Sequence, residues 1–191
     1  MNTQQETTHL DGKMLIAMPG MGDSRFDRSV IFMCAHSETG AMGLIVNKPA
    51  EDLNFNELLE QLEFSPGKEI SEIKVHLGGP VENGRGFVLH SPEYGNGDST
   101  LQVDEDFGMT ATLDILEDIS NGEGPKDCLL ALGYAGWGPG QLEGEIQANG
   151  WLTCEASHDL VFGDKDAEKW TAALASLGIS PSFLSATGGT A

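Results

Sequence analysis

The amino-acid sequence predicts an α+β fold, in which a single domain holds a mixed, mostly antiparallel sheet with flanking helices. Apolar runs of strand length occur near both ends of the chain, and helical patterns are scattered between them. Residues 30–35 and 42–46 are two such runs, and the link between them is so short that it indicates an antiparallel hairpin. The regular alternation of strand and helix that builds a doubly wound parallel sheet is missing from the pattern.

The length and the ends of the chain define the expected domain. The chain has 191 residues, of which 39% are hydrophobic, and this suits one large domain with a sizeable core. Because neither a repeat nor an internal linker is evident, residues 13–180 are expected to form that domain. Residues 1–12 are polar and predict a disordered lead-in, and the small, polar residues 181–191 predict a flexible tail.

The remaining strands follow from short apolar or alternating runs bounded by glycine, proline or asparagine. The run at residues 73–77 alternates with Lys74 and His76, which indicates a strand with one buried face. We expect these further strands at residues 14–18, 73–77, 86–90, 100–103, 128–132 and 151–154.

Helices are predicted where apolar side chains recur with helical spacing. The clearest begins at Phe55, with Asn54 as its cap and Glu57 at the third helical position, as in a capping box. A shorter helix is predicted at residues 113–119. The last helix places Trp170, Leu174 and Leu177 on one face, with Asp164 as a candidate cap and Gly178 as its end.

Residues 133–151 are rich in glycine and aromatic side chains, and they predict a strand, an elbow, a short helix and a new strand. We expect Gly138 to cap the helix, Pro139 to occupy its first position and Gly150 to end it. Gly136 permits close backbone approach, while Tyr134 and Trp137 anchor the elbow against the core. The elbow is either a tightly packed turn or an anion site at the helix start. The packed turn is favoured, because the glycine spacing of phosphate-binding loops is missing.

Charge and targeting signals limit the classes of partner. The formal net charge is −20, from 30 acidic and 10 basic residues, and the basic residues form no cluster along the sequence. Direct binding to nucleic acid or to an anionic membrane is therefore not expected. The N-terminal residues lack the pattern of a signal peptide, and no apolar run is long enough to span a membrane, so a cytoplasmic protein is expected.

Polar residues at the predicted strand ends are the candidate ligand-binding residues. His36 follows the second strand, Asn47 and Lys48 follow the third, and His90 closes a later one. Gly79 and Arg85 flank the turn before that last strand. If these ends converge, then Lys48 and Arg85 could contact an anion; otherwise the same residues cap strands and bind backbone carbonyls or Asp23.

Other chemistry is weakly supported. The sequence contains no GxSxG nucleophile elbow and no closely spaced metal ligands, so neither a catalytic residue nor a metal or other cofactor is assigned. The cysteines (Cys34, Cys128 and Cys154) form no CxxC pair. Cys34 could be a redox-active thiol activated by His36, or a buried core residue, and the apolar run around it favours the second.

Three groups of residues together are similar to one known family. They resemble the AlgH/YqgE family of small bacterial cytoplasmic proteins, which implies an α+β fold whose bifurcated sheet curls into a pseudo-barrel. The resemblance implies no catalytic residue, and the family name comes from a proposed role in transcriptional regulation of alginate synthesis. The groups are Met14–Pro19, Asp23, Phe26, Ser29–Ile31, His36, Gly40 and Gly43–Pro49; then Gly78–Val81 and Arg85–His90; then Gly133–Trp137, Gln141–Glu143, Glu145–Ile146, Asn149 and Trp151–Leu152.

Together these observations favour a non-enzymatic regulatory or binding protein. It would act through a protein partner or a small anionic ligand, and any effect on transcription would be indirect. The alternative is an enzyme that acts on a small anionic substrate near Lys48, Arg85 and His90. A deep pocket with a strongly perturbed titratable group would favour the enzyme, and a shallow surface with exposed apolar residues would favour the binding protein.

Overall fold

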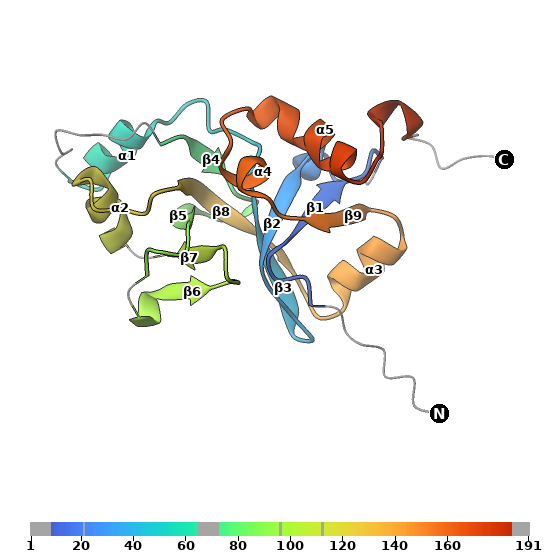
Figure 1. Ribbon diagram of the computed structural model, residues 1–191, viewed down its shortest axis with the longest axis horizontal. Helices are drawn as coiled ribbons and strands as arrows, with labels where there is room; N and C mark the ends of the chain where they lie inside the picture. The colour runs from blue at the N-terminus through green and yellow to red at the C-terminus, as the bar shows by residue number, and fades with distance from the viewer. Residues whose placement is uncertain (1–8, 21, 65–72, 96, 112, 185–191) are drawn as a thin grey trace.

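A single curved sheet contains nine strands of the part of the chain that the structure describes, residues 9–20, 22–64, 73–95, 97–111 and 113–184. The computed structural model orders them β6-β7-β5-β8-β3-β2-β1-β9, with β4 beside β8 (Figure 1). The strands are β1 (Lys13–Ala17), β2 (Val30–Ser37), β3 (Gly40–Ile45), β4 (Val75–Leu77), β5 (Val81–His90), β6 (Thr100–Gln102), β7 (Gly108–Thr110), β8 (Cys128–Trp137) and β9 (Trp151–Glu155). The helices are α1 (Phe55–Gln61), α2 (Leu113–Ser120), α3 (Gln141–Gln147), α4 (His158–Phe162) and α5 (Asp166–Ser176).

The sheet divides at β8. Along one side of β8 runs β5, which is antiparallel to it. On the other side, β4 pairs in parallel with the first half of β8, and β3 pairs antiparallel with its last residues. The pairings among the remaining strands are antiparallel. The α+β fold with a mixed, mostly antiparallel, bifurcated and curled sheet is therefore confirmed.

The consecutive strands β4 and β5 lie on opposite sides of β8, so the short link between them must cross over that strand. The crossing is possible because the link places Gly78 and Gly79 against β8, where side chains would not fit. A Cβ on Gly78 would lie 2.3 Å from the carbonyl oxygen of Gly133, and one on Gly79 would lie 2.1 Å from the carbonyl carbon of Tyr134. Gly79, a candidate ligand-binding residue from the sequence, is thus a residue of the crossing.

β8 continues through the segment that was predicted as an elbow. Gly133 has a φ of +74°, but it forms an irregularity within the strand, and the residues after it pair with β3. The predicted start of α3 is also wrong, because the N-cap is Gly140 and the helix begins at Gln141. Asn149, with a φ of +61°, takes the left-handed position after α3 that was predicted for Gly150. The N–H of Gly150 then bonds to Glu145 O at 2.8 Å, as in a Schellman motif.

Three apolar clusters hold the helices to the sheet. The central cluster, which includes Phe32, Leu89 and Trp170, lies between the inner face of the sheet and helices α4 and α5. The second, which includes Trp137 and Trp151, lies under α3. The third packs α1 and α2 against β4, β5 and β8 around Leu130. In Figure 1, α1 and α2 accordingly stand at one side of the β2–β3 hairpin, and α3 stands at the other.

The β2–β3 hairpin was predicted, and a bulge within it decides which way its side chains point. The register shifts between Met33 and Ala35, and an extra residue of this kind reverses the alternation of faces. Cys34 therefore belongs to the central cluster, whereas His36 faces α3. The strand reaches Ser37, beyond its predicted end.

The predicted helices at Phe55, residues 113–119 and Trp170 are present. Asn54 caps α1 by accepting a hydrogen bond from Glu57 N at 2.8 Å. Gly178, with a φ of +73°, follows the end of α5, but the cap of α5 is Lys165 instead of Asp164. Helix α4 and strand β7 were not predicted, because each is too short to show a period.

The ends of the predicted domain are described in part. Residues 1–8 of the predicted lead-in and residues 185–191 of the predicted tail lie outside the described residues. Residues 9–12 lie along β2, where Gly12 N donates to Met33 O at 2.9 Å. Residues 181–183 form a short 3-10 turn. No helix in the described ranges combines the length and the apolar character needed to cross a membrane.

Candidate functional site

An open hollow of about 670 Å³ lies where β5, the end of β8 and the β2–β3 hairpin meet. We call it the hairpin hollow, and its walls include Thr39, Met42, Arg85, Phe87, Tyr134 and Gly136. Of the residues that were singled out in the sequence, it brings together Arg85, Tyr134, Gly136 and Trp137. The curled sheet creates the hollow, because β5 and β3 lie on opposite sides of β8.

Arg85 is the cation of the hairpin hollow. Its guanidinium carbon lies 5.2 Å from the centre of the Phe87 ring, and its Nη1 lies 3.6 Å from Glu82 Oε2. The Phe87 ring in turn meets the Tyr134 ring edge-on, with 5.7 Å between the ring centres. Arg85 is about half exposed, so most of its donors are free to bind a partner group.

The rest of the segment that was predicted as an elbow joins the hollow to α3. Trp137 packs edge-on against Trp151, with 6.0 Å between ring centres, and its Nε1 donates to Glu145 Oε2 at 2.8 Å. The Oε1 of Gln141 accepts a hydrogen bond from Gly138 N at 3.0 Å. These contacts fix the rim of the hollow, since the turn between β8 and α3 is bonded at both ends.

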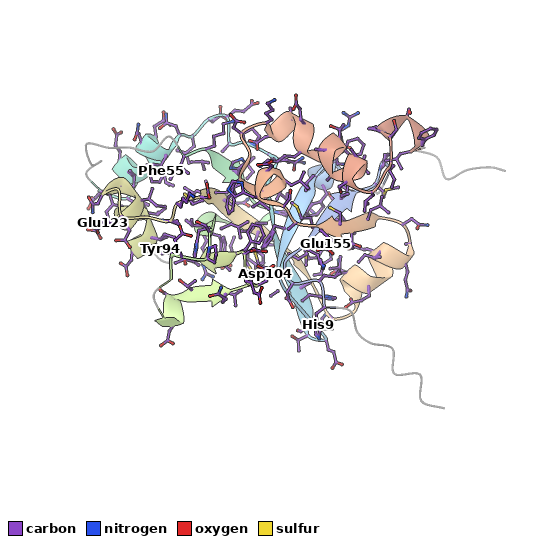
Figure 2. All side chains as sticks on the ribbon, viewed as in Figure 1. His9, Phe55, Tyr94, Asp104, Glu123 and Glu155 are labelled. Carbon is purple, nitrogen blue, oxygen red and sulfur yellow. The ribbon has the colours of Figure 1, made fainter. Side chains whose placement is uncertain are left out.

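His36 faces α3 and joins the β2–β3 hairpin to that helix and to the segment before β1. Leu10 N donates to its Nδ1 at 3.2 Å, so the proton is on Nε2, which donates to Glu143 Oε1 at 2.6 Å. The carbonyl oxygen of His36 accepts a bond from His9 Nδ1, and Figure 2 shows His9 beside the tip of this hairpin. The backbone N–H of Glu143 and the His36 ring lower the pKa of the Glu143 carboxyl.

Asn47 and Lys48 lie at the start of β2, away from the hollow. Asn47 accepts a hydrogen bond from Val30 N at 2.9 Å and donates one to Arg28 O at 2.8 Å. These bonds hold the segment after β3 against the start of β2. Lys48 Nζ donates to Arg25 O at 2.8 Å. Burial lowers the pKa of the Lys48 ammonium, and Asp27 and Asp23 oppose that change.

His90 is fully buried at the far end of β5. Its Nδ1 donates to Ser91 O and its Nε2 accepts from Thr110 Oγ1, both at 2.8 Å. Burial lowers the pKa of the His90 imidazole, opposed by the bond to Ser91 and by Glu93. The six predicted ligand-binding residues (His36, Asn47, Lys48, Gly79, Arg85 and His90) are therefore spread over separate surroundings, and of these only Arg85 lines the hollow.

A buried cluster of charged residues between β4 and α5 was not predicted from the sequence. Asp166 accepts a bond from His76 Nε2 at 2.9 Å and pairs with Lys169 Nζ at 3.1 Å. The helical spacing of the sequence could have predicted that Asp166 and Lys169 are buried, because they stand one turn before Trp170 and Ala173 on the same buried stripe. His76 was predicted on the exposed face of its strand, but it is buried and Leu77 is exposed instead.

The cysteines are free thiols, and burial together with Asp11 raises the pKa of Cys34 to about 12. Activation by His36 therefore has no structural support, since the bulge turns the two side chains to opposite faces. Within the described ranges, no three His, Cys, Asp or Glu side chains are grouped closely enough to hold a metal ion.

The fold and these segments define the class of protein: the family model described as AlgH-like matches residues 14–182, and the chain belongs to this family. It is 62% identical over 181 residues to a UPF0301 protein of Ruegeria pomeroyi, with 94% of this chain and 98% of the relative covered. It is 58% identical over 180 residues to a UPF0301 protein of Cereibacter sphaeroides, with the same coverage. The solution structure of the AlgH protein from Pseudomonas aeruginosa is 42% identical, covers 100% of both chains and superposes with a TM-score of 0.79.

Proposed function

We propose that this protein is a non-enzymatic binding protein that contacts a protein partner through the hairpin hollow. The observation that carries the proposal is the arrangement of Arg85, Phe87 and Tyr134, in which a half-exposed guanidinium lies over the Phe87 ring, which packs against Tyr134, inside an open concave surface. Arginine and aromatic side chains are the residue types that most often supply the binding energy of protein interfaces.

The surroundings of Arg85 support a partner that covers a broad area. Val81, at the start of β5, also lines the hollow and is 37% exposed. A large apolar side chain that remains exposed beside an arginine and aromatic cluster favours burial against another protein.

The chemistry of the walls favours binding over catalysis. Among the described residues that line the hollow, the acidic and basic side chains are Glu82 and Arg85, which face each other. Ser37 and Thr39 are also present, but their hydroxyls bond to one another at 2.7 Å. A nucleophile needs a neighbouring base, and neither hydroxyl has a histidine or lysine among these neighbours. The enzyme alternative at Lys48, Arg85 and His90 loses support, because those side chains have separate surroundings.

The net charge of −20 supports a partner with a basic surface. Repulsion from phosphate makes direct contact with a promoter unfavourable, so a regulatory effect on transcription would pass through the partner.

The test is affinity capture from the protein's own cytosol with four baits: wild type, Arg85→Glu, Val81→Asp and the control Arg25→Glu. Arg25 is a matched control because it is also an exposed arginine paired with an acid, Asp23, at 2.8 Å. We expect a protein that wild type and Arg25→Glu retain, and that both hollow variants lose. The same set of proteins on all four correctly folded baits would contradict the proposal.

A further inference from the structure

The buried charged cluster between β4 and α5 has an unusual distribution of polar contacts. Lys169 is 3% exposed, and its ammonium group donates to Val46 O and to Val161 O, both at 2.9 Å, as well as facing Asp166. Asp166 is 7% exposed and lies between Lys169 and His76. Charged groups are buried only when they are paired in this way, so Asp166 is ionised and Nε2 of His76 carries a proton.

The other nitrogen of the His76 ring, Nδ1, takes no part in these contacts. His76 is 4% exposed, and its Nδ1 is buried without a hydrogen-bond partner among the described residues. A buried polar atom in this condition is destabilising, and a bound water molecule or ion is one way to give it a partner.

His76 lines a cavity of about 150 Å³ between β4, the start of β8 and the segment after α4. Its other walls include Ile73, Lys74, Cys128, Phe162 and Asp164. A neighbouring cavity of about 220 Å³ shares Ile73, Cys128 and Phe162, so the two spaces adjoin. This region is separate from the hairpin hollow, with which it shares no lining residue.

We propose that the cavity beside His76 binds a small oxyanion, a carboxylate or a phosphate, through the Nδ1–H of a protonated His76. Protonation leaves the cluster with a net charge of +1, from two cations and Asp166. A bound monoanion restores neutrality and places every charge next to one of opposite sign, in the order Lys169, Asp166, His76 and anion. Such alternation compensates the desolvation of buried charges, and the anion gives the unpartnered nitrogen its hydrogen bond.

The groups around the cavity agree with an anionic ligand. Lys74 stands at its wall, with Nζ 2.8 Å from the carbonyl oxygen of Asp164. Of the acidic groups near His76, Asp166 is held by His76 and Lys169, and Asp164 at the cavity wall is exposed to solvent. Cys128 contributes a neutral thiol, because burial and Asp127 raise its pKa to about 12. The volume admits an ion with a few non-hydrogen atoms.

The test uses the full chain labelled with ¹⁵N at histidine, titrated with acetate, bicarbonate and inorganic phosphate at constant ionic strength set by chloride. We expect at least one anion to move the His76 Nδ1 resonance saturably toward that of a protonated ring, with a Kd of about 1 mM or tighter. His90 is the internal control, because both of its ring nitrogens already have partners. The three arms distinguish a carboxylate from a phosphate ligand.

Two variants complete the test. Cys128→Met fills the cavity while leaving His76, Asp166 and Lys169 unchanged in sequence, and it should weaken binding at least tenfold while the protein stays folded. His158→Gln changes an exposed histidine nearby and should leave binding unchanged. A His76 resonance that is unmoved by all three anions, or that moves equally in Cys128→Met, would overturn the proposal and leave a cavity that holds only water.

Discussion

The α-carbon of Gly79 lies directly against the backbone of Tyr134, where a Cβ on residue 79 would be 2.1 Å from the carbonyl carbon. Gly79→Ala should therefore destabilise the protein by about 3 kcal/mol or more, because the clash is with backbone that cannot turn away. Equilibrium unfolding in urea measures this change. Gly84→Ala is the control, since it lies in β5 with open space around its α-carbon and a much smaller effect is expected. Equal losses in the two variants would contradict the close crossing.

Replacing glycine by alanine should have opposite effects on stability at positions 144 and 140. Gly144 lies inside α3 with nothing within 4 Å of the position that an added methyl group would occupy, so Gly144→Ala should stabilise the protein by about 0.5–1 kcal/mol through helix propensity. Gly140 is equally open but has a φ of +73°, so Gly140→Ala should destabilise it by about 1 kcal/mol. Thermal unfolding of both variants provides the measurement, and a change of the same sign in both would refute this account of α3.

Asp166→Asn should cost about 3–5 kcal/mol, because it leaves the ammonium of Lys169 buried without its counter-charge. The double variant Asp166→Asn with Lys169→Met should recover a large part of that loss, since the uncompensated charge is then removed. The free energies of unfolding of the two single variants and the double variant form a thermodynamic cycle. Additive losses in that cycle would show that the two side chains do not interact.

Cys34 should react slowly with a thiol reagent. Burial raises its pKa to about 12, so at pH 8 roughly one thiol in ten thousand is ionised, against about a quarter for a free cysteine. In a variant with Cys128→Ala and Cys154→Ala, we expect labelling of Cys34 at least about a hundredfold slower than that of a free cysteine. Unfolding in urea should abolish the difference. Rapid labelling of the folded variant would restore the redox hypothesis for this residue.

Local pattern was enough to predict much of the fold. The hairpin was predictable because two apolar runs flank a link too short for any other connection, and α1 because Asn54 precedes a helical stripe. Strand ends were harder to place, since pairing with a distant strand extends β8 through Gly133 to Trp137. The hairpin hollow could be predicted only as separate residues. Arg85 and Tyr134 were both singled out, but their proximity depends on β5 and β8 being neighbours in the sheet.

The family, the α+β class and the excess of acidic residues can all be recognised in the sequence alone, because they depend on composition and on patterns within a few residues. Long-range packing was needed to show that His36 and Cys34 face opposite ways, and that His76 meets Asp166 and Lys169. One bulged residue reverses a strand's faces, and a buried hydrogen bond joins His76 to Asp166, 90 positions apart in the chain. Neither feature depends on neighbours in sequence, so both follow from how distant segments pair and pack.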